Sequence, residues 1–338
     1  MHPALPASHS QQLGLFIPAA ARHEDVPAPL QSAPVRLSEA AGTYCAHLVA
    51  NERATHTVAS TALDLAALVE QTGDISLSII TPTHLADHVR WLRTERHNGT
   101  ASLRRKIATL KTFFRHAVAV GWLTTNPADS LAYPPPHRPP VVALNPTEVE
   151  AVIAAAAPDL AWHAVVLLFV DAGLKRDEVL ALRTEDLYLA REPGESQLTV
   201  RHAAQAKRVR RRSVPLTPRA HFALARLLSA PLPGGPLLSI SVRGVNFVVE
   251  TVGHRAQITR LKKLTPDLLR DTFAVRAVED RVGREAAAAE RGATARELDR
   301  LRANHDLQVL QLLGLSRNSD MALRYRAAAA VRRSATMS

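Results

Sequence analysis

The sequence predicts a mainly α-helical protein of the α+β class, with a small β-hairpin or sheet and two domains. At 338 residues the chain exceeds the usual size of one domain. Hydrophobic residues make up 46% of it and aromatic residues only 4%, which favours helices with apolar stripes over aromatic-rich sandwiches. A Pro-rich stretch, Tyr133-Pro-Pro-Pro-His-Arg-Pro-Pro140, is the best candidate for a domain boundary.

The chain divides into four parts on this basis. Residues 1–34 are rich in Ala, Pro, Ser and His without periodicity, which is typical of a disordered tail. Residues 35–133 show helical spacing and form the first predicted domain. Residues 134–140 form a semi-rigid linker, and residues 141–338 form the second predicted domain.

In the first domain, apolar residues recur at helical spacing in 57–70, 82–94 and 102–120. Gly121 ends the last of these helices, and Asn126-Pro127 follows as a breaker.

The second domain alternates predicted helices with one pair of strands. The strands, 197–200 and 211–216, flank a basic hairpin or loop. A charged, Ala-rich stretch, 279–304, indicates one or two solvated helices that serve as a spacer or as a partner-binding arm. The predicted helices are 147–157, 161–172, 176–182, 218–228, 242–251, 266–278 and 307–313.

Charge and composition narrow the class of partner. The formal net charge of +11 suits a polyanion, and nucleic acid is the first candidate because each neutralised phosphate releases counterions. No apolar run is long enough to span a bilayer, and the N-terminus has no basic region typical of a signal peptide. The single cysteine, Cys45, forms neither an internal disulfide nor a metal cluster. We therefore expect a cytoplasmic, nucleoid-associated protein without metal or cofactor.

Five motifs follow one another in a fixed order. They are Ser102-Leu-Arg-Arg-Lys106 with Gly121-Trp-Leu-Thr-Thr-Asn-Pro127; Ala172-Gly-Leu-Lys-Arg-Asp-Glu178; Lys207 with Arg212-Ser-Val-Pro-Leu216; Thr265-Pro-Asp-Leu-Leu-Arg-Asp-Thr-Phe-Ala274; and Leu312-Leu-Gly-Leu-Ser316 with Arg324-Tyr325. Together they resemble the tyrosine recombinase (phage integrase) family. Each motif alone is weak, but five in the family's order are a specific pattern.

The resemblance implies a fold and a reaction. An N-terminal helical core-binding (SAM-like) domain and an integrase-like catalytic domain would clamp double-stranded DNA from opposite sides. A tyrosine attacks the scissile phosphate, which forms a 3′-phosphotyrosine and frees a 5′-hydroxyl, while cationic side chains stabilise the developing charge. The family acts as a tetramer on paired sites, so the partners are DNA and either further copies of the chain or a second recombinase.

Four residues match positions of the family's catalytic set. Tyr325 is the expected nucleophile, although a tyrosine on a C-terminal helix can also serve only for packing. Arg270 matches the second arginine. Lys207 matches the hairpin lysine that protonates the leaving oxygen, but its basic surroundings fit plain phosphate binding equally well. Lys175 stands where the first arginine is expected.

Three positions depart from the family. Lys175 keeps the charge of the first arginine but not its bidentate fork. Asp267 replaces a histidine, and a carboxylate about 5 Å from a phosphate costs roughly 3 kcal/mol. Leu315 replaces the final His or Trp and offers no donor, although a hydrogen bond to a charged group contributes about 1.5–3 kcal/mol. These departures predict impaired catalysis.

Basic residues in both domains are predicted to contact DNA phosphates, which position a duplex without reading its sequence. They are Arg104, Arg105, Lys106, Lys111, Arg208, Arg210, Arg211 and Arg212.

Three interpretations stay open. The chain is a site-specific recombinase of full or reduced activity, or a catalytically inactive recombinase-fold accessory or architectural DNA-binding protein. The third, a helical protein that binds RNA or an acidic partner, is disfavoured by the ordered motifs.

Overall fold

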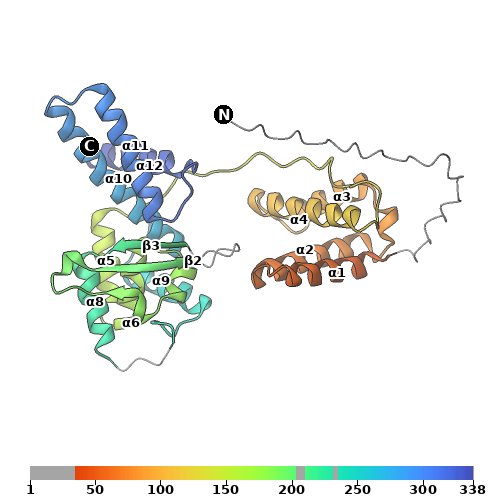
Figure 1. Cartoon of the computed structure of the whole chain (residues 1–338), viewed down its shortest axis with the longest axis horizontal. Coiled ribbons are helices and arrows are strands. Elements are labelled where there is room, and N and C mark those ends of the chain that lie inside the picture. The colour runs from red at the N-terminus through yellow and green to blue at the C-terminus, as the bar shows by residue number, and fades with distance from the viewer. Residues whose placement is uncertain (1–34, 203–209, 231–234, 338) are drawn as a thin grey trace, which may run out of the picture. The chain divides into compact units, whose positions relative to one another are not determined.

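The computed structural model describes residues 35–202, 210–230 and 235–337, and the chain divides between His137 and Arg138 into two compact units. The predicted mainly helical fold with one small sheet is confirmed. We describe each unit by itself (Figure 1).

Unit one is helical. Its elements are α1 (Leu37–Ala50), α2 (Thr55–Thr72), the short 3₁₀ helix η1 (Leu77–Ile79), α3 (Pro82–Thr94) and α4 (Thr100–Ala119). α3 begins as the sequence predicts: Thr81 caps it by accepting a hydrogen bond from the His84 backbone N–H, and Pro82 occupies its first turn. Phe113 and Phe114 of α4 are fully buried and pack with the apolar faces of α1 and α2.

Unit two packs helices around a three-stranded antiparallel sheet of order β1-β2-β3, with Thr199 opposite Ser213. Its strands are β1 (Leu187–Tyr188), β2 (Gln197–His202) and β3 (Arg210–Pro215). Its helices are α5 (Pro146–Ala156), α6 (Leu160–Val170), α7 (Arg176–Ala181), η2 (Thr184–Asp186), η3 (Pro193–Glu195), α8 (Pro218–Leu228), α9 (Val242–Arg255), α10 (Pro266–Glu290), α11 (Ala295–Leu312) and α12 (Met321–Met337).

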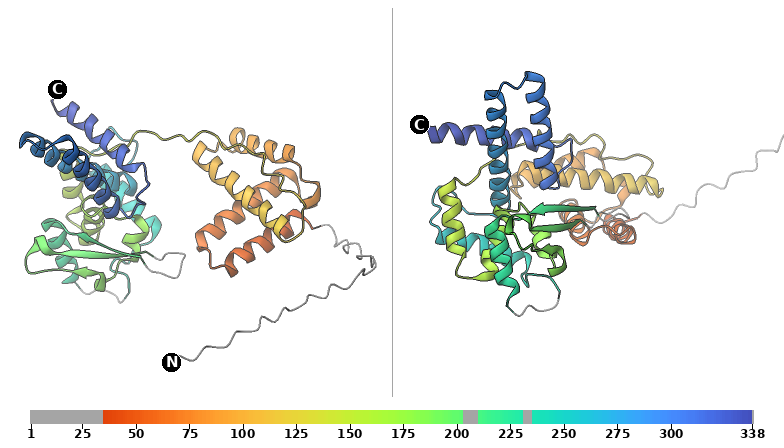
Figure 2. Two further views of the ribbon diagram at one scale, coloured as in Figure 1. Left: turned by 45° about the horizontal axis from the view of Figure 1, so that its top comes forward. Right: turned by 60° about the vertical axis from the view of Figure 1, so that its left-hand side comes forward.

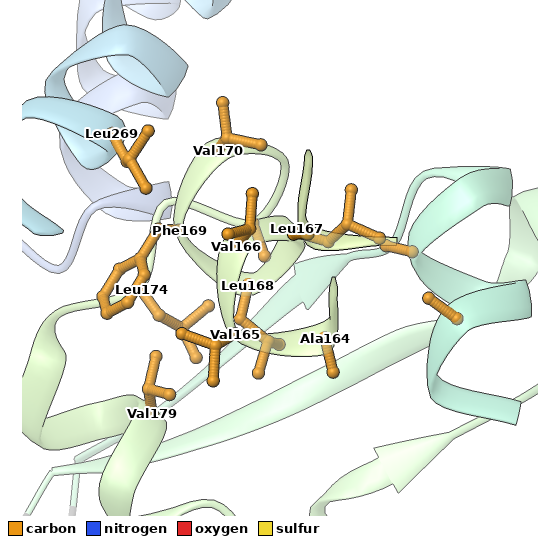
Figure 3. Close-up of a cluster of buried hydrophobic side chains, with 14 of the residues drawn as sticks. Ala164, Val165, Val166, Leu167, Leu168, Phe169, Val170, Leu174, Val179 and Leu269 are labelled. Carbon is orange, nitrogen blue, oxygen red and sulfur yellow. The ribbon is translucent and has the colours of Figure 1, made fainter. Parts of the chain in front are cut away.

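The centre of unit two is α6. Every residue from Ala164 to Val170 is buried, since other elements cover this helix on all sides, as an all-round apolar helix requires. Leu174, Val179 and Leu269 close around it, which brings α7 and α10 onto the same core (Figure 3). None of the helices within the described residues is both long and apolar enough to cross a membrane.

The stretch 279–304 differs from its predicted form. α10 continues without a break to Glu290, and after a turn α11 returns alongside it as a helical hairpin (Figure 2). The two helices are not wholly solvated, because Glu285 and His305 are buried between them. The His305 Nδ1 lies 2.8 Å from Glu285 Oε1, and Arg326 of α12 binds the same carboxylate at 2.9 Å. His305, interpreted from sequence as an ordinary polar residue, is therefore part of a buried polar cluster.

Candidate active site

Arg270 lies in the second turn of α10, which begins at a Thr265 cap and Pro266. Leu269 on one side and Ala274 further along are buried, so this turn is packed and the Arg270 side chain is only 8% exposed. Its Nη1 donates to the Gly173 carbonyl and its Nη2 to the Leu313 carbonyl. Arg270 thus joins the loop before α7 to the loop before α12.

Gly173 is required at this junction. Its φ of +63° lies in the left-handed region, and a Cβ added there would overlap the ring of Phe273. The Gly173 carbonyl can face Arg270 only because the backbone turns here without a side chain.

A buried carboxylate supports two guanidinium groups. Glu178 of α7, 4% exposed, binds Arg212 of β3 through two hydrogen bonds of 2.7 Å. The Arg270 Nη1 lies 3.9 Å from the same carboxylate. Burial alone would raise the pKa of Glu178, but the hydrogen bonds from Arg212 and from the Lys175 backbone hold this pKa below its usual value. Glu178 is therefore an anion that fixes both arginines in place.

Lys175 stands immediately before α7, with its backbone N–H 2.8 Å from Glu178 Oε2. Within the described part of the chain, its ammonium group forms no hydrogen bond, and it lines a hollow shared with Lys263 and Asp267. Burial and the nearby charges of Arg270 and Arg212 lower the pKa of Lys175, while Glu178 opposes this shift. An anion in the hollow would meet a cation that is not already neutralised by a bound carboxylate.

Tyr325, the predicted nucleophile, lies on α12 and is 2% exposed among Ala274, Val275 and Val278 of α10. Its hydroxyl donates a 2.9 Å hydrogen bond to Oδ1 of Asp271. Burial and the Asp271 carboxylate raise the pKa of the phenol well above its ordinary value, although Arg270 opposes them. The phenol is therefore protonated and lies next to Arg270 along the α10 surface.

The structure also describes Asp267 and Leu315, the two other positions at which the sequence departs from the family pattern. Asp267 is exposed in the first turn of α10, where a carboxylate is favoured by the helix dipole. Leu315 follows Gly314 at the end of α11 and lines a hollow with Arg211 and Arg212. Among the described residues, neither Asp267 nor Leu315 forms a side-chain hydrogen bond or ion pair with Arg270, whose partners are the Gly173 and Leu313 carbonyls.

The predicted basic hairpin is described only in part. Lys207 and Arg208 lie outside the described residues, and Arg210 is described as part of β3 without its side chain. Arg211 is exposed and pairs across the sheet with Arg201. Arg212, predicted as a DNA contact, instead points inward to Glu178 and also donates to the Leu312 carbonyl at 2.9 Å.

In unit one, the predicted DNA-binding residues of α4 are held by neighbours. Arg105 and Lys106 bind the carboxylate of Asp64, which is 2% exposed, at distances of 2.5 and 2.8 Å. Arg104 and Lys111 both lie over the ring of Tyr133, at 5.3 and 5.1 Å from its centroid. α4 therefore presents a basic face whose side chains are already positioned by the protein.

Comparison with known proteins shows what the chain is similar to. Residues 37–133 match the model of the phage integrase SAM-like domain. The tyrosine recombinase XerD of Caulobacter vibrioides is 30% identical over 199 residues, which cover 53% of this chain and 62% of that protein. The chain is similar to tyrosine recombinases over about half of its length. A second relative, the tyrosine recombinase XerC of Pelobacter propionicus, is 26% identical over 65% of this chain and 78% of its own length.

Solved structures show the same fold. A lambda integrase dimer bound to a COC′ core site superposes with a TM-score of 0.61 at 19% identity, covering 87% of this chain and 78% of that chain. The Tn1549 transposon integrase in complex with circular intermediate DNA has a TM-score of 0.56 at 15% identity, covering 86% of this chain and 95% of that chain. At these identities the likeness concerns the fold alone.

Sequence reasoning missed the residues that hold other site residues in place. Glu178 lies in the motif 172–178 and Asp271 in the motif 265–274, but neither motif predicts a role for its acidic residue. An acidic residue three positions after Lys175, at a helix start, is a capping signal that predicts the hydrogen bond to the Lys175 backbone. No local pattern predicts its partner Arg212, which lies in another element. Within the described residues, no group of three or more His, Cys, Asp and Glu side chains could hold a metal ion.

Proposed function

We propose that this protein is a recombinase that breaks and rejoins DNA at a specific site through a 3′-phosphotyrosine formed by Tyr325. The proposal rests on one observation: the buried side chain of Arg270 connects three segments that were predicted to form the site. Arg270 hydrogen-bonds the loop that leads to Lys175 and the loop that leads to α12, and its neighbour Asp271 binds Tyr325. The similar proteins reported above are recombinases and integrases, which supports the same activity.

The chemistry follows from these positions. The fork of Arg270 would bind the non-bridging oxygens of the scissile phosphate once a phosphate replaces one of its carbonyl partners. Lys175 would add a second positive charge from its hollow. The Tyr325 hydroxyl would attack phosphorus, and the 5′-oxygen would leave with a proton from Lys207.

The proposed partner is double-stranded DNA, contacted by the basic face of α4 and by the β2–β3 hairpin. Lambda integrase has been solved as a dimer on a core site and as a tetramer on a Holliday junction, which supports a homo-tetramer on DNA, or an assembly with a partner recombinase. Such a protein would work in the cytoplasm, at the nucleoid.

The test starts from the full-length chain. Bound duplexes are selected from a genomic pool, and the recovered site is nicked near its centre, so that cleavage traps the covalent adduct. We expect a slow adduct with the wild-type chain and none with Tyr325→Phe, which keeps the ring and removes the nucleophile. Specific binding without any adduct would reject strand cleavage.

A second function, a catalytically inactive accessory or architectural DNA-binding protein, is favoured by Leu315, which offers no hydrogen bond where the family has a donor. Under this alternative, the variants Lys175→Arg, Asp267→His and Leu315→His combined in one chain would create adduct formation that the wild type lacks. Efficient cleavage by the wild type would reject it.

A further inference from the structure

The contact between Tyr325 and Asp271 assigns a role that the family pattern leaves open. Because the phenolic O–H donates to Oδ1 at 2.9 Å, the acceptor oxygen of Asp271 carries no proton in this arrangement. We propose that Asp271 is the general base that takes the proton from Tyr325 as the phenol attacks the phosphate. This inference rests on the proposed strand cleavage and deepens it by naming where that proton goes.

Asp271 is half-buried and differs from the buried carboxylates of unit two in its partners. Asp171, Glu178 and Asp186 are each bound by an arginine, and Glu285 is bound by Arg326 and His305. Within the described residues, Asp271 has no ion pair, and its hydrogen-bond partner is a phenol. A carboxylate already bound by a guanidinium is a weak proton acceptor, whereas Asp271 keeps its basicity.

The surroundings of Asp271 favour protonation during the reaction. The charged and titratable groups that face it are Asp267 and Arg270 of α10 and Arg324 and Tyr325 of α12. Burial raises the pKa of Asp271 above its usual value, and Asp267 raises it further against the opposing effect of Tyr325, Arg270 and Arg324. A base of raised pKa is closer to the pH of the reaction and is therefore more effective.

Histidines do not replace Asp271 in this role. Asp267 and Leu315 occupy two positions where the resemblance predicts side chains that donate or move protons. In the described part of unit two, the Tyr325 hydroxyl contacts no histidine: His305 binds Glu285 and His221 binds Ser196. Among the described side chains, the tyrosine proton therefore has an acceptor in Asp271.

The step balances as a single transesterification. The bond between Tyr325 Oη and phosphorus forms, the bond between phosphorus and the 5′-oxygen breaks, and the phenolic proton moves to Asp271 Oδ1. The leaving 5′-oxygen takes a different proton, which Lys207 is expected to supply. The two proton transfers involve different oxygens, so the roles of Asp271 and Lys207 can be separated by experiment.

The experiment compares two nicked duplexes carrying the selected site. One has the natural scissile phosphate, and the other has a 5′-bridging phosphorothioate, whose thiolate leaves without a proton. On the natural duplex, we expect Asp271→Asn, which keeps a hydrogen-bond acceptor but not a base, to slow adduct formation about 10²- to 10⁴-fold. On the sulfur duplex this defect should persist, whereas the defect of Lys207→Ala should disappear.

The pH profile gives a second readout. Wild-type adduct formation should fall as pH drops and Asp271 becomes protonated, and Asp271→Asn should lose this acid limb. Asp271→Glu, which restores a carboxylate, should recover part of the rate and the limb, so that the test stands even if the amide variant folds poorly. Asp280→Asn, at an exposed position of the same helix, is the matched control and should behave as the wild type.

Three results would overturn the proposal: an Asp271→Asn rate within threefold of the wild type, a faster rate, or a defect that vanishes on the sulfur duplex. A faster rate would mean that the Asp271 carboxylate only restrains the Tyr325 nucleophile. If the wild type forms no adduct on either duplex, strand cleavage itself fails and the role of Asp271 falls with it. Failure of the general base alone is distinct, because the wild-type adduct then remains.

Discussion

Glu178 holds Arg212 and Arg270 in place, and we expect Glu178→Ala to lower the free energy of unfolding of unit two by about 3–5 kcal/mol. All three side chains are almost buried, with exposed fractions of 4% for Glu178, 12% for Arg212 and 8% for Arg270. Removal of the carboxylate leaves two guanidinium groups facing each other without an anion. A pair of unit charges about 4 Å apart interacts by about 4 kcal/mol at an effective dielectric of 20, which agrees with this range.

The assay is denaturant unfolding followed by tryptophan fluorescence. The chain has three tryptophans, and in a background with Trp91→Phe and Trp122→Phe, Trp162 of α6 reports on unit two. This separation matters because a chain of two units need not unfold in one step. Glu290→Ala, at the exposed end of α10, is the control and should change stability by less than about 0.5 kcal/mol.

The stability contribution of Glu178 should depend on pH in a defined direction. Because the pKa of Glu178 is lowered in the folded state, its contribution is fully present above the unfolded value of about 4.3 and is lost as pH falls through the folded value. The stability gap between wild type and Glu178→Gln should therefore narrow below about pH 4. A loss smaller than about 1 kcal/mol for Glu178→Ala at neutral pH, or a gap that widens in acid, would refute the reasoning.

Three further outcomes follow from contacts described above. Gly173→Ala should destabilise unit two by about 1–3 kcal/mol through its left-handed φ and the Phe273 ring, while Gly283→Ala, in open space on α10, should stabilise by about 0.5–1 kcal/mol; equal effects in denaturant titrations would contradict this. Asp64→Asn should lower the melting temperature of unit one and, by freeing two cations, steepen the salt dependence of DNA binding; an unchanged slope would argue against it. Glu285→Gln should destabilise the α10–α11 hairpin by about 2–4 kcal/mol, seen as faster hydrogen exchange there, and unchanged exchange would reject it.

The sequence predicted elements whose ends are marked locally. The bounds of α3 and α8 agree with prediction, because both begin with a Thr-Pro pair that caps and starts a helix. The length of α10 was underestimated, since the residues after 278 are polar on most faces and show little apolar period. The sequence nevertheless contains signals for the end of α10. Gly292 follows this helix and adopts a φ of +86°, and Thr294 with Glu297 forms a capping box that starts α11.

The candidate site was predictable as a set of motifs but not as a set of contacts. Tyr325 and Arg270 could be found because each lies within a recognisable motif. Arg212 looked like part of a basic run, and only the pairing of β3 with β2 and its packing near α7 turn this side chain inward to Glu178. Asp64 likewise looked like one polar residue on a helix, yet it anchors two cations of α4. Partners that lie in different elements leave no local trace in a sequence.

Inserted residues should have different effects at the two ends of α10. Arg270 and Asp271 are consecutive, and a helix turns about 100° per residue, so one inserted residue before them would exchange the neighbours of guanidinium and carboxylate. The turn at 291–294 lies about 30 Å further along the helix at 1.5 Å per residue, and it is exposed for most of its length. A loop or a small fluorescent domain inserted there should leave the hydrogen bond between Tyr325 and Asp271 intact, so this turn is the place at which the protein can be labelled or lengthened while adduct formation is monitored.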